Sequence, residues 1–292
     1  MTNYNYAKKN DGLFEQKLTQ ETLTSLIETP EVNWLNAQSF ETTTIETSGY
    51  KPHTRDKGFN SGTIENKKQV YTLGFDRDIE FFVDIADEDE TNQDLAAARV
   101  TGNFVTENAG PEVDAYRFSK MATTAITEGK TANTKLTVDN VYSVLKAAIL
   151  PLRRYGAPNI IGYLSSETMD LLERSKEFTR NITNQNVGMT ALESRITSLD
   201  GVILVEVWDT DRFATKFDFT EGFVKAADGL DLAFLLVAKP AIIAKAKFNS
   251  VYLFAPGTHT EGDGWLYQNR LYHDLFVLES RKDALYAHTK EA

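Results

Sequence analysis

A dense run of carboxylates is the part of this sequence best suited to chemistry. Six acids fall between residues 84 and 94: Asp84, Asp87, Glu88, Asp89, Glu90 and Asp94. Converging carboxylate oxygens bind Mg²⁺ and Ca²⁺, so a metal-dependent hydrolase using this run is one interpretation. The D-x-[DN]-x-[DN]-G loop of a calcium site is absent, however. Because negative charge is favourable in the first turn of a helix, and a helix pattern follows, we expect a solvated helix entrance.

Three further metal-ligand types, His259, Glu261 and Asp263, stand two residues apart. On a β-strand their side chains would share one face. Pro256 and three glycines in the same stretch instead predict a turn. One histidine with two acids also rarely forms a strong metal site, so we interpret this segment as structural.

No pattern in the sequence reaches a catalytic signature. His273-Asp274 resembles a base and its orienting acid, but neighbouring residues of a strand point to opposite faces. Ser165 fits a helix cap better than a nucleophile. G-x-S-x-G, P-loop and G-x-G-x-x-G motifs are absent, and the chain has no cysteine. We therefore expect no enzyme activity, no cofactor and no metal site.

The carboxylate run leads into a long amphipathic helix with one interruption. Helix periodicity covers residues 92–105 and 112–126, and Gly110-Pro111 predicts a break between them. Other segments predict shorter elements: strands at 80–85, 160–164, 202–207 and 230–237, helices at 141–152, 168–174 and 240–245, and an antiparallel meander over the C-terminal tail. The whole is a mixed α+β chain with two sheets and one long helix.

A protruding hairpin precedes the carboxylate run. Residues 40–50 and 68–75 have strand composition, and the stretch between them is polar and broken by Gly and Pro. A lone two-stranded hairpin is marginally stable in water. We therefore expect it to lie on another copy of the chain.

Composition limits the classes of function. The net charge of −11, from 42 acidic and 31 basic residues, argues against a protein that binds nucleic acid through a basic surface. No apolar run approaches the roughly 18 residues of a membrane span.

Four segments, in order, resemble the major capsid proteins of tailed bacteriophages. They are DIADEDET with PEVDAYRFSK (84–91 and 111–120), YLSSETMDLLERS (163–175), LDGVILVEVWDTDRF (199–213), and the tail FAPGTHTEGDGWLYQNRLYHDLFVLESRKDALYAH (254–288). The resemblance implies the Hong Kong 97-like major capsid fold, which encapsulin nanocompartments and gene transfer agents share. By segment, it implies an N-terminal arm (1–36), an extended E-loop hairpin (37–78), a peripheral domain with a long spine helix (79–136 and 250–292), and an axial domain (137–249).

The implied function is self-assembly into the icosahedral shell around double-stranded phage DNA. The implied partners are other copies of the chain in hexamers and pentamers, a separate scaffolding protein, the portal protein, and DNA bound without sequence specificity; no membrane is involved. The implied location is the virion, with assembly in the cytoplasm of the bacterial host. An encapsulin-type shell with a cargo enzyme is the alternative that shares the fold. Candidate subunit-interface residues are basic in the hairpin and acidic in the run: Lys51, Arg55, Lys57, Asp84, Asp87, Glu88, Asp89 and Glu90.

Overall fold

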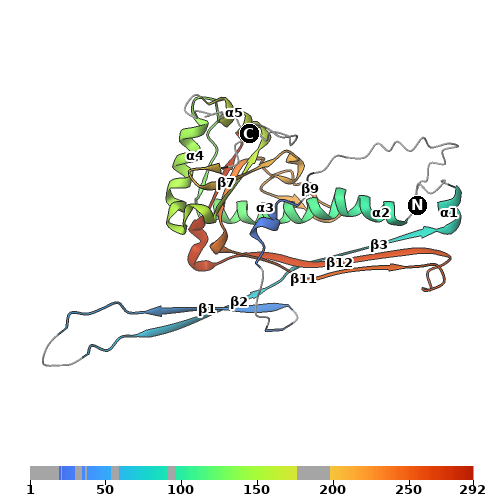
Figure 1. The fold of residues 1–292 in the computed structure, drawn as a ribbon, viewed down its shortest axis with the longest axis horizontal. Coiled ribbons are helices and arrows are strands. Elements are labelled where there is room, and N and C mark those ends of the chain that lie inside the picture. The colour runs from blue at the N-terminus through green and yellow to red at the C-terminus, as the bar shows by residue number, and fades with distance from the viewer. Residues whose placement is uncertain are drawn as a thin grey trace, which may run out of the picture.

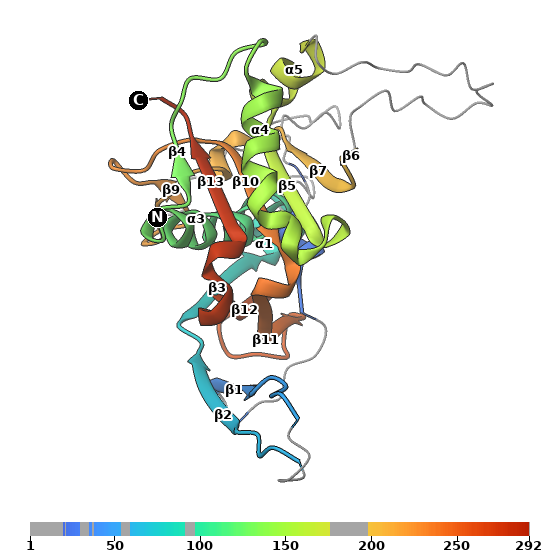
Figure 2. The ribbon, with the colours of Figure 1, turned by 90° about the vertical axis from the view of Figure 1, so that its left-hand side faces the viewer.

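The computed structural model describes residues 22–29, 38–53, 59–90, 97–175 and 198–291, together with residues 20, 35 and 36. Within these ranges the chain forms a body around one sheet, an elongated second sheet with a helix lying along it, and a hairpin that projects beyond both (Figure 1). Figure 2 shows the hairpin at the end opposite the body. The α+β class predicted from the sequence is confirmed.

The body contains a mixed six-stranded sheet. The strands run in the order β4 (Thr131–Ala132), β13 (Leu285–Thr289), β10 (Leu232–Ala238), β5 (Ile160–Ser165), β7 (Val202–Val207) and β6 (Ser198–Leu199). Central strand β10 is buried along its whole length and pairs antiparallel with both β5 and β13. Burial on both faces explains its continuous apolar sequence, because neither face needs polar side chains.

Helices cover both faces of this sheet. On one face lie α4 (Val141–Ile149) and α5 (Ser166–Arg174), which share a core with Phe234 and Leu236 of β10. On the other face lies α3 (Gly110–Thr127), whose core includes Leu235 and Val237 of the same strand. The alternation of β10 residues between the two cores follows from the period of two in a strand.

The second sheet is antiparallel and unusually long. Its order is β11 (Ile242–Phe254), β12 (Gly264–Val277) and β3 (Phe75–Asp84). Helix α2 (Ala97–Phe104) lies over it, with the ring of Phe104 5.3 Å from that of Phe81. Gly264 allows the close approach of β12 and β3, since a Cβ there would lie 2.2 Å from the carbonyl oxygen of Val83.

Helix α2 continues into α3 without the break predicted at Gly110-Pro111. The turn between them, η2 (Val105–Ala109), is π-helical, and Pro111 lies in the first turn of α3, where its missing N–H is tolerated. The predicted interruption is therefore a change of helical pitch. The helix links the two sheets, because α2 packs on the long sheet and α3 packs on the body (Figure 1).

The predicted hairpin is confirmed, with a shorter first strand than expected and a second strand that begins and ends earlier. β1 (Ser39–Thr47) and β2 (Ile64–Thr72) pair antiparallel from Ser39 opposite Thr72 to Thr47 opposite Ile64. Most side chains beyond Thr42 on β1 are exposed. The second strand begins at Ile64 rather than residue 68, because the pairing with β1 continues through the polar residues 65–67 to Thr47 opposite Ile64.

Two other expectations are wrong. The helix expected at 240–245 is a single 3-10 turn followed by β11, because Ile242 and Ala244 are drawn into the core between α3 and the sheets. The C-terminal tail is not one meander: β11 and β12 form a hairpin, but β13 crosses to the body sheet.

The remaining elements are short: α1 (Ile85–Glu90), β8 (Phe217–Asp218), β9 (Val224–Lys225), η1 (Thr24–Ile27), η3 (Leu150–Tyr155), η4 (Ala157–Asn159), η5 (Thr210–Arg212), η6 (Lys239–Ala241) and η7 (Glu279–Ala284). None of the described helices is long and apolar enough to cross a membrane.

A fully buried ion pair fastens two distant segments to α3. Asp114 accepts hydrogen bonds from the backbone N–H groups of Leu23 and Thr24, at 2.8 and 3.0 Å, and from Nη1 of Arg212 at 3.1 Å. Arg212 in turn donates to Asp209 at 2.6 Å. Side chains of Asp114 and Arg212 are 0% exposed, so each charge depends on the other for compensation.

We expect Asp114→Asn to lower the free energy of unfolding by roughly 3 kcal/mol, because the buried Arg212 loses one of its two carboxylates. Urea unfolding of unassembled protein measures this loss. The control is Asp170→Asn, which removes an exposed pair with Arg174 on α5 and should cost under about 1 kcal/mol. Equal losses for the two variants would show that the buried network is dispensable.

Candidate functional site

The hairpin is the most prominent surface feature, and its root is firmly built. Phe40 of β1 and Tyr71 of β2 are buried and stack at 5.4 Å, and Phe276 of β12 packs on Phe40 edge-on at the same distance. Tyr272 donates its hydroxyl to the carbonyl oxygen of Leu73 at 2.9 Å. The root is therefore part of the protein's own core.

Asp274 connects this root to α3. One carboxylate oxygen accepts the backbone N–H of Gly74, which joins β2 to β3, at 3.0 Å. The other accepts from the Tyr116 hydroxyl at 2.7 Å and from Nζ of Lys120 at 2.9 Å. Burial and the neighbouring Asp274 charge raise the pKa of Tyr116 above its usual value, so its hydroxyl keeps its proton and donates.

Beyond the root the hairpin carries apolar side chains into solvent. Ile45 is 65% exposed and Ile64 is 76% exposed, while Tyr50 and Phe59 near the tip are fully exposed. Exposed ion pairs cross the ribbon, including Lys67 with Glu46 at 2.8 Å and Lys68 with Glu41 at 2.6 Å. Such exposed pairs contribute little stability in water. Exposed apolar residues on such a projection indicate a surface that contacts another molecule.

The structure separates the two groups of predicted interface residues. Lys51 is exposed near the hairpin tip and donates to the carbonyl oxygen of Ser61 at 2.9 Å, whereas Arg55 and Lys57 lie outside the described residues. Asp84 ends β3 and accepts the N–H of Ala86 at 2.8 Å; Asp87 lies on α1.

Glu88, Asp89 and Glu90 complete α1, and their side chains lie outside the description. The acids thus begin a separate short helix after β3, and the approach to the long helix at residues 91–96 is not described. The hairpin and α1 stand at opposite ends of the molecule (Figure 1), so Lys51 does not meet Asp84 or Asp87 within one chain.

The candidate catalytic residues have structural roles. Ser165 caps α5, as expected, by accepting the N–H of Thr168. His259 lies in the predicted turn and pairs with the carbonyl oxygen of Gly264 at 2.8 Å. No group of three or more metal-ligating side chains gathers within the described ranges.

His273 and Asp274 do not form a base-and-acid pair. Both ring nitrogens of His273 lack a hydrogen-bond partner in the described part of the chain, and the ring packs edge-on against Phe75 and Tyr116. Burial, together with the positive charge of Arg117, lowers the pKa of His273 to about 3. The residue is a neutral ring between α3 and the long sheet.

The sequence analysis missed Asp114, Arg117 and Arg212. Asp114 and Arg117 share the buried face of α3 with Phe118 and Met121. Two opposite charges at i, i+3 on an apolar stripe are a usable signal of a buried polar network. Their partners at Thr24 and Arg212 lie about 90 residues away along the chain, so the sequence could not supply them.

Comparison with known proteins gives a result only at the level of structure. No family model matches the chain, and no curated protein matches it. A chain of the capsid of cyanophage P-SCSP1u superposes with a TM-score of 0.67 at 12% identity, covering 98% of this chain and 93% of that one. A chain of the mature capsid of bacteriophage PhiM1 gives 0.69 at 12% identity, covering 98% and 92%. A native gene transfer agent (GTA) capsid gives 0.54 at 12% identity, covering 98% and 95%.

The chain has a phage-capsid fold. The matches extend over almost the whole chain, so the likeness concerns the fold as a whole and not one part of it. This confirms the fold implied by the four capsid-like segments. At 12% identity the likeness concerns the fold alone.

The neutral burial of His273 predicts acid sensitivity. In the unfolded chain the ring titrates near 6.5, and in the fold near 3, so protons bind the unfolded state preferentially between these values. Stability is therefore fully present above pH 6.5 and declines as the pH falls toward 3. Arg117 and Lys120 on α3 oppose protonation, and Asp274 favours it less strongly than burial disfavours it.

We expect His273→Phe to flatten the dependence of unfolding free energy on pH by up to about 1.4 kcal/mol per pH unit, the effect of one proton. Urea unfolding of unassembled protein at a series of pH values from 7 to 4 measures this. His53→Gln, at an exposed hairpin position, is the control and should follow the unmodified protein. Parallel curves for all three would mean that His273 does not carry the acid sensitivity.

Proposed function

We propose that this chain is the major capsid protein of a tailed phage, which assembles into the icosahedral shell around double-stranded DNA. The observation that carries the proposal is the hairpin on a phage-capsid fold: it is rooted in the protein's own core, yet its outer strands expose Ile45, Ile64 and Tyr50 to solvent. Burying such side chains contributes about 1.5–3 kcal/mol each, which favours contact with another copy. The role is structural rather than catalytic.

We assign each part of the fold a separate place in the shell. The hairpin β1–β2 corresponds to the E-loop, and the continuous α2–η2–α3 helix to the spine helix. The long sheet of β3, β11 and β12 forms the peripheral part, and the body sheet with α4 and α5 forms the axial part that meets its copies in pentamers and hexamers. On this assignment β13 joins the axial part, although it follows the peripheral strands in sequence.

Charge supports a container that does not adhere to its contents. A net charge of −11 disfavours tight binding to the polyanion inside, so packaged DNA would contact the wall without sequence specificity. A separate scaffolding protein would guide assembly in the cytoplasm of the bacterial host, and the portal protein would occupy one vertex. The finished chain would reside in the virion.

Replacing residues 48–63 by Asn-Gly tests the hairpin's role. Thr47 and Ile64 are directly opposite, so a two-residue turn closes the shortened ribbon without strain. We expect the unassembled variant to unfold within about 1 kcal/mol of the unmodified chain, because the described residues among those removed, 48–53 and 59–63, are all exposed. Size-exclusion chromatography and negative-stain microscopy, with the scaffolding partner present, should show closed particles for the unmodified chain and none for the variant.

Three results would count against the proposal or its hairpin contact. A chain that remains monomeric under every assembly condition is not a capsid protein. Normal particles from the shortened chain would show that the outer hairpin is not needed for the contacts that assemble the shell. A large loss of stability in the shortened monomer would place the hairpin within its own core.

A further inference from the structure

A groove of about 660 Å³ runs between the long helix and the long sheet. Part of its roof is formed by Val105 of η2 and Val113 of α3. Part of its floor is formed by one apolar residue from each strand of the sheet: Ile79, Leu271 and Val251. Val105 and Val251 are 46% and 54% exposed. The described part of the chain thus leaves apolar surface uncovered in the groove, although its burial would be favourable.

Two aromatic contacts separate the helix from the sheet at the two ends of the groove. The ring of Phe104 on α2 lies 5.3 Å from that of Phe81, and the ring of Tyr116 on α3 lies 4.0 Å from that of Phe75. Phe75 and Phe81 are six residues apart on β3, or about 20 Å. The groove lies between these contacts, under the π-helical turn η2.

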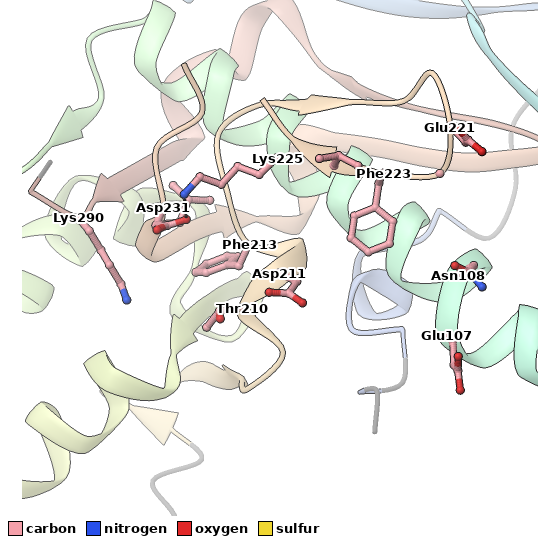
Figure 3. A pocket seen from close by; sticks show the side chains of 13 residues that line it. Glu107, Asn108, Thr210, Asp211, Phe213, Glu221, Phe223, Lys225, Asp231 and Lys290 are labelled. Carbon is pink, nitrogen blue, oxygen red and sulfur yellow. Dashed lines mark hydrogen bonds and ion pairs between the residues drawn. The ribbon is translucent and has the colours of Figure 1, made fainter. Parts of the chain in front are cut away.

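The rim of the groove is held in place by Arg77 of β3. Arg77 donates to the carbonyl oxygens of Phe219, at 2.6 Å, and Gly222, at 3.4 Å, in the loop of the β8–β9 ribbon. On its far side this loop borders a second hollow, shown in Figure 3, and Asn108 and Glu221 line both spaces. Three acids from separate elements converge on that second hollow: Glu107, Asp211 and Glu221. Because the rim is fixed, a ligand in the groove would not have to order it.

Unpartnered nitrogen atoms mark the end of the groove nearest the body. Arg117 and His273 both belong to its lining, and each is 1% exposed. The Nη atoms of Arg117 donate to Thr24 and Glu28. Its Nε and both ring nitrogens of His273 have no hydrogen-bond partner in the described part of the chain. Buried polar groups are normally paired, so these three atoms are available to the polar group of a ligand.

The charges around the groove favour an uncharged ligand. Its arginines are already paired, both at 2.7 Å: Arg77 with Glu112, and Arg117 with Glu28. The other charged side chains of the lining are acids at exposed positions, Asp78 and Glu221. No positive charge is left for an anionic head, and a cationic head at the inner end would lie beside Arg117. A hydroxyl, which both donates and accepts, suits the neutral ring of His273 and the Nε–H of Arg117.

We propose that the groove binds an uncharged amphiphile. Its apolar body lies along Val105, Val251 and Leu271. Its hydroxyl head accepts from Nε of Arg117 and pairs with a ring nitrogen of His273. The volume lies within the range of small-molecule pockets, roughly 300–1,000 Å³. The inference does not depend on assembly, so it stands apart from the proposed function.

Displacement of a fluorescent hydrocarbon from the full, unassembled chain tests the site. Diphenylhexatriene has no polar atom and fluoresces in apolar surroundings, so it reports on the apolar part of the groove. We expect it to bind and octanol to displace it. Octanoate and octylammonium carry the same chain but should displace it at least about tenfold more weakly, because their charged heads lose hydration without gaining a counter-ion.

A pair of tryptophan variants locates the probe. Val251→Trp adds bulk to the floor of the groove and should lower the affinity for diphenylhexatriene at least about tenfold. Tyr252→Trp is the matched control, because it changes the next position of the same strand, whose side chain points to the other face of the sheet. Both positions are 54% exposed, so neither variant should lose its fold, and the control should bind the probe as the unmodified chain does.

His273→Phe tests the head of the ligand alone. The variant keeps an aromatic ring and removes both nitrogen atoms. The affinity for octanol should therefore fall about tenfold, while that for diphenylhexatriene stays within about twofold. A purely structural effect of the substitution would change both affinities together.

Three results would overturn the inference and leave the capsid proposal standing. If diphenylhexatriene does not bind the unassembled chain, or binds the Val251→Trp variant equally well, the groove holds no such ligand. Equal displacement by the three octyl compounds would show that the groove does not favour an uncharged head. A groove that binds the probe in the unassembled chain but not in assembled particles would belong to a contact between copies. A failure of the chain to assemble leaves these measurements unchanged, so it bears on the proposed function alone.

Discussion

The buried pairing of Asp114 with Arg212 is the constraint on which the rest of this structure depends. A carboxylate and a guanidinium with no exposure are stable only while each holds the other and their remaining hydrogen bonds are made. Here those bonds come from Leu23 and Thr24 of the N-terminal segment and from Asp209 before η5. One position on α3 therefore fixes the paths of two segments that sequence places far from it.

The long helix connects the two sheets, because its two ends pack on different ones. Phe118 and Met121 of α3 lie in the core of the body, while Phe104 of α2 packs on the long sheet. The π-helical turn between them changes the direction in which side chains point, which suits a helix that must bury different faces at its two ends. It also places Glu107 beside the β8–β9 ribbon.

The hairpin combines a buried, stable root with an outer part that has no packing partner among the described residues of its own chain. Its root is buried by Phe40, Tyr71 and Phe276 and tied by Asp274 to Gly74, so its direction is set by the fold. Its outer part has no such support and exposes Ile45 and Ile64. A rigid root with an exposed, partly apolar end is the arrangement that a contact between copies requires, because little ordering entropy remains to be lost on binding.

Local chemistry in the sequence determined a large share of this fold. The Thr-rich strand composition of β1, the apolar runs of β5, β7 and β10, and the Ser165 cap of α5 are set by neighbouring residues, so their elements were predictable. Errors arose where distant packing outweighs local preference. Residues 240–245 pair with β12 instead of forming a helix, because antiparallel pairing and burial of Ile242 and Ala244 outweigh a short segment's weak helix propensity. Tertiary structure alone decided that Asp114 meets Arg212, and that Glu107, Asp211 and Glu221 converge, since charges on separate elements acquire partners only when the elements pack.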